Sequence, residues 1–411
     1  ILMTRAAKEK YHGTSATSEV REFRIRMGME LDLMNLWFGK TADYFKQFIS
    51  DQTIGMARIN RFDFTTLPIN LLYLLYYEYR RNEKESLNFS FFEYGKNSNG
   101  NPDDDRWEMY LELQEMYAIL QRWYNDKELY HYLGFLFFNF KAQTPFRDIY
   151  TQWKALNSRD KFLKDIQHTI ATRMLDRYLE ETEKAAPDYQ KCLKTMTEAI
   201  SDFRENWYNN DKELYQILIL LDIFRILDSK SIKKLPTDYF TRKSGQKDGE
   251  DKEHILSQTP RKDNGEIATI KTDWERFAQS EDFKDIRSQM QEILNHSDAE
   301  LTEQELTQLQ NLLNSAGLNS IGNMVLLDLR INRSYGNADY AHKRTIIFQE
   351  YMNQKYVRPH TLAVFMKGDI DAREATGIPL NRWTLEDIKR NTDKIAKEIG
   401  KNFNAWLTQN N

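Results

Sequence analysis

The stretch "NSIGNMVLLDLRINRSYGN" (residues 319–337) decides the fold of the second half of the chain. Gly322 leads into a short apolar run, residues 324–327, and a run of this length entered through a turn residue predicts a β-strand. From Ile331 onward the pattern predicts a turn that enters a helix. The stretch therefore predicts one strand and one helix in a chain whose other patterns are mostly helical.

An earlier stretch, "DKEHILSQTP" (251–260), supplies a candidate partner strand that ends in Glu253 and His254. A Glu–His pair in a charged loop is more often solvated than functional. Asn323 opens the second strand, and Asn332 follows it by nine residues, at the predicted helix start. A strand, a strand and a helix can bring these four side chains together, although Asn323 could equally be a turn residue and Asn332 a helix cap.

The rest of the chain predicts a mainly helical protein. Its 411 residues contain only 8 prolines and 16 glycines, and 40% of them are hydrophobic. Apolar residues at helical spacing run through residues 16–230, and the sequence 228–253 turns polar. We therefore expect a helical recognition or scaffold domain at 1–230, a second domain at 231–370 with inserted helices at 270–316, and a closing helix within 371–411. The inserted helices are expected near 273–295 and 302–315.

Composition also excludes several classes of protein. A single cysteine rules out an internal disulfide and a cysteine-rich zinc site, and it fits a reducing cytoplasm. No apolar run is long enough for a membrane-spanning helix, so no membrane partner is expected. No phosphate-binding glycine loop and no paired-histidine zinc helix is found. A net charge of −4 means that any contact with nucleic acid would use a local basic patch or another part of a larger protein.

The four candidate residues suit phosphodiester hydrolysis. A histidine, with an ordinary pKa of about 6.5, can take a proton from water at neutral pH. Mg²⁺ needs only one or two protein oxygen ligands, which Glu253 and Asn332 could supply, and Mn²⁺ is the alternative. The Asn323 carbonyl could accept the proton of His254 Nδ1 and leave Nε2 as the base.

These residues resemble the HNH, or ββα-metal, nucleases. "EHILSQ" (253–258) is similar to the opening of the family motif, and "IGNMVLLDLRINRSYGN" (321–337) to its continuation. The resemblance implies a small ββα-metal nuclease unit embedded in helices. It makes Glu253 and Asn332 metal ligands and His254 the general base, and it makes Asn323 the residue that orients the base.

The resemblance also implies phosphate contacts for Lys343, with Arg333 and Arg330 as further basic candidates. Two positions depart from the family pattern. Ser257 stands where proline is usual, and Glu253 replaces the aspartate of some members.

A wider resemblance covers most of the chain. "MYAILQRWYNDKELYHYLGFL" (116–136), "SRDKFLKDI" (158–166) and "RWTLEDIKRNTDKIAKEI" (382–399) are similar to proteins that join a ParB-like domain to an HNH domain. These include the GmrSD-type, modification-dependent (type IV) restriction enzymes. "ARINRFDFTTL" (57–67) resembles sequence that follows the ParB-like domain, whose own motif is not found. We therefore expect the C-terminal part of such a protein, or a subunit that works with a separate ParB-like NTPase.

Two functions follow as expectations. The first is a metal-dependent endonuclease that cuts foreign, modified phage double-stranded DNA in bacterial defence; because one HNH site cuts one strand, two copies in a homodimer or two cutting events would be needed. The second is a helical interaction or DNA-sensing module whose HNH unit is degenerate.

Overall fold

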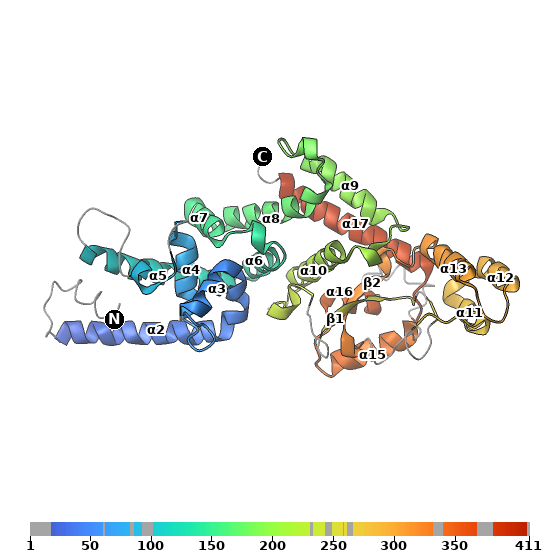
Figure 1. The fold of residues 1–411 in the computed structure, drawn as a ribbon, viewed down its shortest axis with the longest axis horizontal. Helices are drawn as coiled ribbons and strands as arrows, with labels where there is room; N and C mark the ends of the chain where they lie inside the picture. Colours follow the sequence, from blue (N-terminus) through green and yellow to red (C-terminus); the bar gives the residue numbers. More distant parts are fainter. Residues whose placement is uncertain are drawn as a thin grey trace. The chain divides into compact units, whose positions relative to one another are not determined.

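The computed structural model divides into two units, residues 1–166 and 167–411, which are described separately here. The residues that it describes are 18–60, 62–82, 86–92, 102–230, 233–242, 249–257, 259–260, 266–331, 340–367 and 381–408. The predicted mainly helical fold is confirmed throughout these ranges (Figure 1). None of their helices combines the length and the apolar character needed to span a membrane.

The first unit is built from helices around an aromatic core. They are α2 (Ser18–Phe45), α3 (Asp51–Ile59), α4 (Asn70–Arg80), α5 (Pro102–Asn125), α6 (Lys127–Asn139) and α7 (Phe146–Leu156). Asp126 begins α6 by accepting hydrogen bonds from two backbone amides of its first turn. Phe48 and Phe137 stack with their ring centroids 3.8 Å apart. Helix α8 (Arg159–Leu175) continues the chain into the second unit.

The second unit joins further helices to a small sheet. The helices are α9 (Tyr189–Ser201), α10 (Asp211–Asp228), α11 (Lys271–Ala278), α12 (Arg287–Asn295), α13 (Glu303–Ser315), α15 (Tyr340–Met352), α16 (Pro359–Met366) and α17 (Leu385–Thr408). The closing helix is confirmed as α17, which packs against α9. Its predicted apolar residues Ile388, Ile395 and Phe403 are buried.

The predicted helix at 273–295 is wrong in one respect, because two helices occupy this range. Helix α11 ends at Ala278 and α12 begins at Arg287. Between them the Ser280 hydroxyl accepts a hydrogen bond from the Asp282 amide at 3.3 Å, so this backbone donor is taken up in a turn. The helix predicted at 302–315 is confirmed as α13. The first compact unit ends at Ile166, and the predicted domains 1–230, 231–370 and 371–411 stay a prediction.

Strands β1 (Glu250–His254) and β2 (Met324–Asp328) form an antiparallel pair, as Figure 1 shows. Glu250 lies opposite Asp328, and His254 lies opposite Met324. Both predicted strands are thereby confirmed, and the register brings the end of β1 to the start of β2. The residues immediately after Ile331, where a turn into a helix was predicted, lie outside the described residues.

Gly322 is required by the close packing of α17 on the 3₁₀ turn η9 (Ile321–Asn323) that precedes β2. A Cβ at this position would lie 2.3 Å from Ile388 O and 2.6 Å from Thr392 N. These are backbone atoms of a helix, so they cannot turn aside as a flexible side chain would. The glycine therefore allows α17 to pack closely against the turn that carries Asn323.

A buried ion cluster fixes the start of β1. The guanidinium of Arg358 donates to Glu250 Oε1 and Oε2, each at 2.7 Å, and to Asp222 Oδ2 on α10 at 2.7 Å. Asp222 also accepts a hydrogen bond from the His360 amide at the start of α16. All three charged side chains are buried, so the cluster ties β1, α10 and α16 together in the interior.

Arg358→Met is expected to lower the free energy of unfolding by about 3–5 kcal/mol, because it leaves two buried carboxylates without a cation. Burial raises the pKa of Asp222 to about 6, and loss of Arg358 would raise it further. The folded form then holds protons that the unfolded form has released. The variant should therefore regain stability as the pH falls from about 7.5 to about 5.5.

Urea denaturation of both proteins across this pH range measures the effect. Arg276→Met is the matched control, because Arg276 makes an exposed pair with Asp273 at 3.8 Å and should cost less than about 1 kcal/mol. Equal losses for the two variants would contradict the structural role of the cluster.

Candidate active site

His254 occupies the last position of β1 and is 9% exposed. Its ring stacks on Tyr208, with the centroids 4.9 Å apart and the planes 19° apart. Its Nε2 lies 2.9 Å from Asn319 Oδ1. The ring is therefore held both by an aromatic face and by a hydrogen bond in its own plane.

Asn319 sets the direction of that hydrogen bond. Its Nδ2 donates to Asn314 Oδ1 at 2.6 Å, and its backbone carbonyl accepts from the Trp207 amide at 2.9 Å. With Nδ2 turned to Asn314, the Oδ1 of Asn319 faces His254 and can only accept a hydrogen bond. The neutral His254 ring then carries its hydrogen on Nε2 and its basic lone pair on Nδ1.

Asn323 does not contact the histidine as expected. Its Oδ1 accepts from the Leu256 amide at 2.8 Å, and its Nδ2 donates to Leu256 O at 3.0 Å and to Leu318 O at 2.8 Å. These bonds use both N–H groups of a fully buried amide. Asn323 therefore fixes the backbone just after His254, while Asn319 orients the ring. Since Asn319 engages Nε2, the atom expected to act as the base, Nδ1 becomes the candidate for that role.

Glu253 is paired with Lys343, which lies on α15. Lys343 Nζ is 2.8 Å from Glu253 Oε1 and donates to the His254 carbonyl at 2.7 Å. Lys343 is fully buried, whereas the Glu253 side chain is 17% exposed. The expected phosphate contact of Lys343 does not fit this placement, because a buried ammonium has no surface to offer DNA. Lys343 instead joins α15 to the end of β1.

The structure says less about the other residues that were predicted to bind phosphate or metal. Arg330 is exposed, and its Nε lies 3.7 Å from Asp328 Oδ1. Arg333 and the predicted metal ligand Asn332 lie outside the described residues.

The described donor atoms fit a hard divalent cation in part. Within these residues no group of three or more His, Cys, Asp and Glu side chains could hold a metal ion. Mg²⁺ does not require such a group, because water and substrate oxygens complete its shell. Glu253 is the described carboxylate beside His254, and its partial exposure leaves it accessible. Lys343 already pairs with this carboxylate, so a cation would compete with Lys343 for it.

Tyr208 is also held in place by Lys252. Lys252, two residues before His254 on β1, places its Nζ 4.0 Å from the Tyr208 ring centroid. The same ammonium donates to the Tyr208 carbonyl and pairs with Asp211. The stacking partner of His254 is therefore bound to the same strand as His254 itself.

The sequence prediction missed Asn319 and Tyr208. Asn319 stands four residues before Asn323 in the quoted stretch, but no spacing rule connects it with His254. Tyr208 belongs to a short echo, "WYNDKELY" (123–130) and "WYNNDKELY" (207–215), whose aromatics predict packing at helix ends. Trp207 does pack in the interior, being 1% exposed.

Residues 197–398 match the family described as GmrSD restriction endonucleases, C-terminal domain. The site described above lies wholly within this range. This region of the chain is therefore similar to the C-terminal domain of restriction endonucleases of that family. No curated protein matches the chain, and no solved structure does.

The hydrogen bond from His254 to Asn319 predicts which tautomer of His254 is present, and this can be measured. In long-range ¹H–¹⁵N spectra of histidine-labelled protein at about pH 8, neutral His254 should carry its proton on Nε2. His296 is an internal reference of the opposite kind, because its Nδ1 lies 2.7 Å from the Glu292 carbonyl, which can only accept. Asn319→Leu should shift His254 towards a mixture of tautomers and leave His296 unchanged. A proton on Nδ1 of His254 in the wild type would contradict the assignment.

Proposed function

We propose, from the match of residues 197–398 to the C-terminal domain of GmrSD restriction endonucleases, that this region is a metal-dependent HNH-type DNA endonuclease. The observation that carries the proposal is the meeting of β1, β2 and α15 at Glu253 and His254. A strand pair and a helix that converge on a histidine and a carboxylate support a ββα-metal unit. The substrate would be foreign double-stranded DNA, with modified phage DNA as the specific target.

His254 would act as the general base. Its Nδ1 takes a proton from the attacking water, while Nε2–H stays bonded to Asn319 Oδ1. The imidazolium that forms has its new charge stabilised by this amide oxygen. Stacking on Tyr208 keeps the ring from rotating during the transfer.

Glu253 and Asn332 would hold one divalent cation, Mg²⁺ or Mn²⁺. When bound, the cation would neutralise a non-bridging phosphate oxygen and the leaving 3′ oxygen. Glu253 would then turn from Lys343 toward the ion or share its two oxygens between them, and Lys343 would keep its bond to the His254 carbonyl.

The partner, oligomeric state and cellular location of the enzyme are also proposals. A ParB-like NTPase domain or subunit would act with this region, a homodimer would supply two sites for two strands, and a cytoplasmic location fits a defence nuclease.

A DNA-sensing or interaction module with a degenerate nuclease unit is the second candidate. One observation favours it: the Glu253 carboxylate already has a buried cationic partner in Lys343, which would weaken binding of a metal ion. Activity decides between the two candidates, because a degenerate unit cuts nothing.

His254→Ala should reduce plasmid nicking by at least a hundredfold, roughly the contribution of a general base. Plasmid DNA and DNA from a phage with modified bases are each incubated with the full chain and Mg²⁺ or Mn²⁺, and products are separated by electrophoresis. Glu253→Gln should lose activity as well, with part of it restored at a high concentration of Mn²⁺.

His296→Ala is the matched control, since His296 is exposed on the same unit and should retain full activity. Absence of cutting by the wild-type protein on every DNA would favour the sensing module. Cutting by His254→Ala at the wild-type rate would remove His254 from the mechanism.

A further inference from the structure

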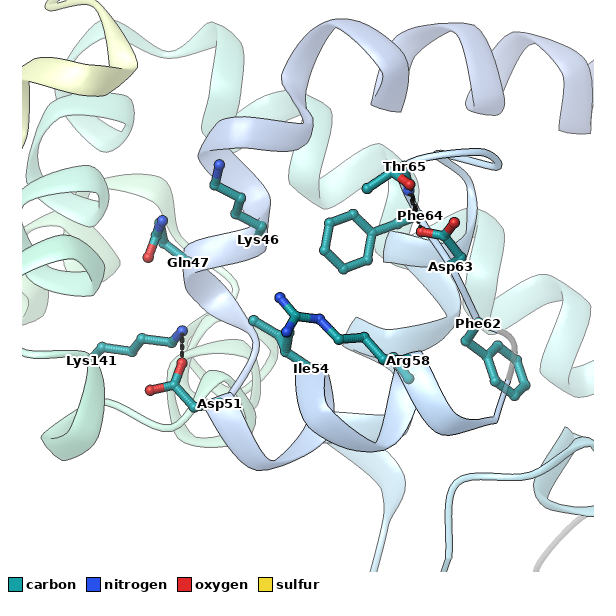
Figure 2. Close-up of a pocket in the computed structure, with 11 residues that line it drawn as sticks. Lys46, Gln47, Asp51, Ile54, Arg58, Phe62, Asp63, Phe64, Thr65 and Lys141 are labelled. Atoms are coloured by element: carbon teal, nitrogen blue, oxygen red, sulfur yellow. Dashed lines mark hydrogen bonds and ion pairs between the residues drawn. The ribbon is translucent and has the colours of Figure 1, made fainter. Parts of the chain in front are cut away.

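The first unit contains a pocket of about 460 Å³, within the usual range for small-ligand sites, about 300–1,000 Å³. Helix α3, the 3₁₀ turn η1 (Lys46–Phe48), the segment 62–65 and Lys141 line it, and Figure 2 shows these side chains. Residues 57–58 and 62–65 of the lining belong to "ARINRFDFTTL" (57–67), a segment to which the nuclease chemistry gives no task. The lining mixes apolar, amide and charged groups.

Both lysines that line the pocket are already neutralised. Lys141 Nζ lies 2.6 Å from Asp51 Oδ1, and Lys46 Nζ lies 2.6 Å from Asp43 Oδ1. Arg58 is different, because the residues that the structure describes offer its exposed guanidinium no ion pair and no hydrogen bond. In Figure 2 this guanidinium points into the middle of the pocket residues. Arg58 therefore remains available as a cation for a ligand.

The remaining carboxylate of the pocket is occupied locally. Asp63 Oδ1 accepts hydrogen bonds from the Thr65 amide at 2.9 Å and from the Thr65 hydroxyl at 2.7 Å. These bonds hold the pKa of Asp63 below its ordinary value, so this carboxylate stays ionised. Its Oδ1 is engaged by Thr65, and among the described residues Arg58 is the lining cation that remains for an anionic ligand.

The ring of Phe64 also lines the pocket. Phe64 is half-buried, and within the described residues no other ring stacks on it, whereas Phe62 packs on Phe92 at 5.5 Å. The half-buried amide of Gln47 also lines the pocket and makes no hydrogen bond within those residues. A ring face, a guanidinium and an amide are the groups that receive a base, a phosphate and a base edge.

We infer that this pocket binds a nucleotide, with the base against Phe64 and the phosphate on Arg58. The pocket volume, the available cation and the available ring face together carry the inference. It goes beyond the proposed nuclease activity and does not depend on His254. The nucleotide can come from two sources, a free mononucleotide or a nucleotide of a DNA strand.

Binding to the full chain in the presence of EDTA tests the inference without cleavage. The probes are dAMP, measured by calorimetry, and a labelled single-stranded oligonucleotide and its abasic counterpart, measured by anisotropy. Arg58→Gln should raise the Kd of the bound probe about tenfold or more, since it removes a charged hydrogen bond. Phe64→Leu should raise the Kd of the base-containing strand about fivefold or more and leave the abasic strand unchanged.

Arg21→Gln is the matched control, because Arg21 is an exposed arginine of the same unit that does not line the pocket. It should bind as the wild type does, and thermal melting confirms that each variant is folded. Binding of dAMP identifies a free nucleotide as the ligand, and binding of the strand alone identifies DNA. The inference is overturned if no probe binds, if Arg58→Gln and Arg21→Gln bind alike, or if the abasic strand binds as tightly as the base-containing one.

Discussion

The buried bond between Arg358 and Glu250 is the constraint on which the geometry of the second unit depends. Glu250 begins β1, and Arg358 ties it to Asp222 on α10 with contacts of 2.7 Å. Breaking such a pair costs far more than an exposed pair does, because a lone charge would remain in the interior. Since β1 ends at His254 only four residues later, the position of the candidate base follows from this cluster.

The far end of β1 is fixed by a different kind of contact. The Asn323 amide bonds to both backbone groups of Leu256, which continues the pairing of the strands beyond His254. The close packing of α17 against Gly322 holds the turn that carries Asn323. With the strand fixed at both ends, Asn319 and Tyr208 need only hold the ring, and catalytic groups held by such supporting contacts keep their reactive geometry.

Much of this fold could be predicted from the sequence, because helical periodicity and the short apolar run at 324–327 are local patterns. The contacts around His254 could not. Asn319 and Asn323 are the same residue type on the same turn, and only the packing of that turn decides which amide reaches the ring. The burial of Lys343 could not be predicted for a similar reason: lysine side chains are usually exposed, and the pairing of Lys343 with Glu253 arises from the position of α15. The break between α11 and α12 contains the Ser280 turn and bonds from Arg287 to the Ala278, Gln279 and Ser280 carbonyls, which helical periodicity does not indicate.

In the proposed nuclease, Glu253 and Asn332 hold one divalent cation next to Nδ1 of His254. Anomalous diffraction from crystals of the full chain soaked in Mn²⁺ tests this arrangement. We expect a single strong peak within about 2.0–2.6 Å of a Glu253 oxygen and of the Asn332 side-chain oxygen, on the side of the ring that carries Nδ1. A Mn²⁺ peak elsewhere in the second unit, with Glu253 still paired to Lys343, would contradict it.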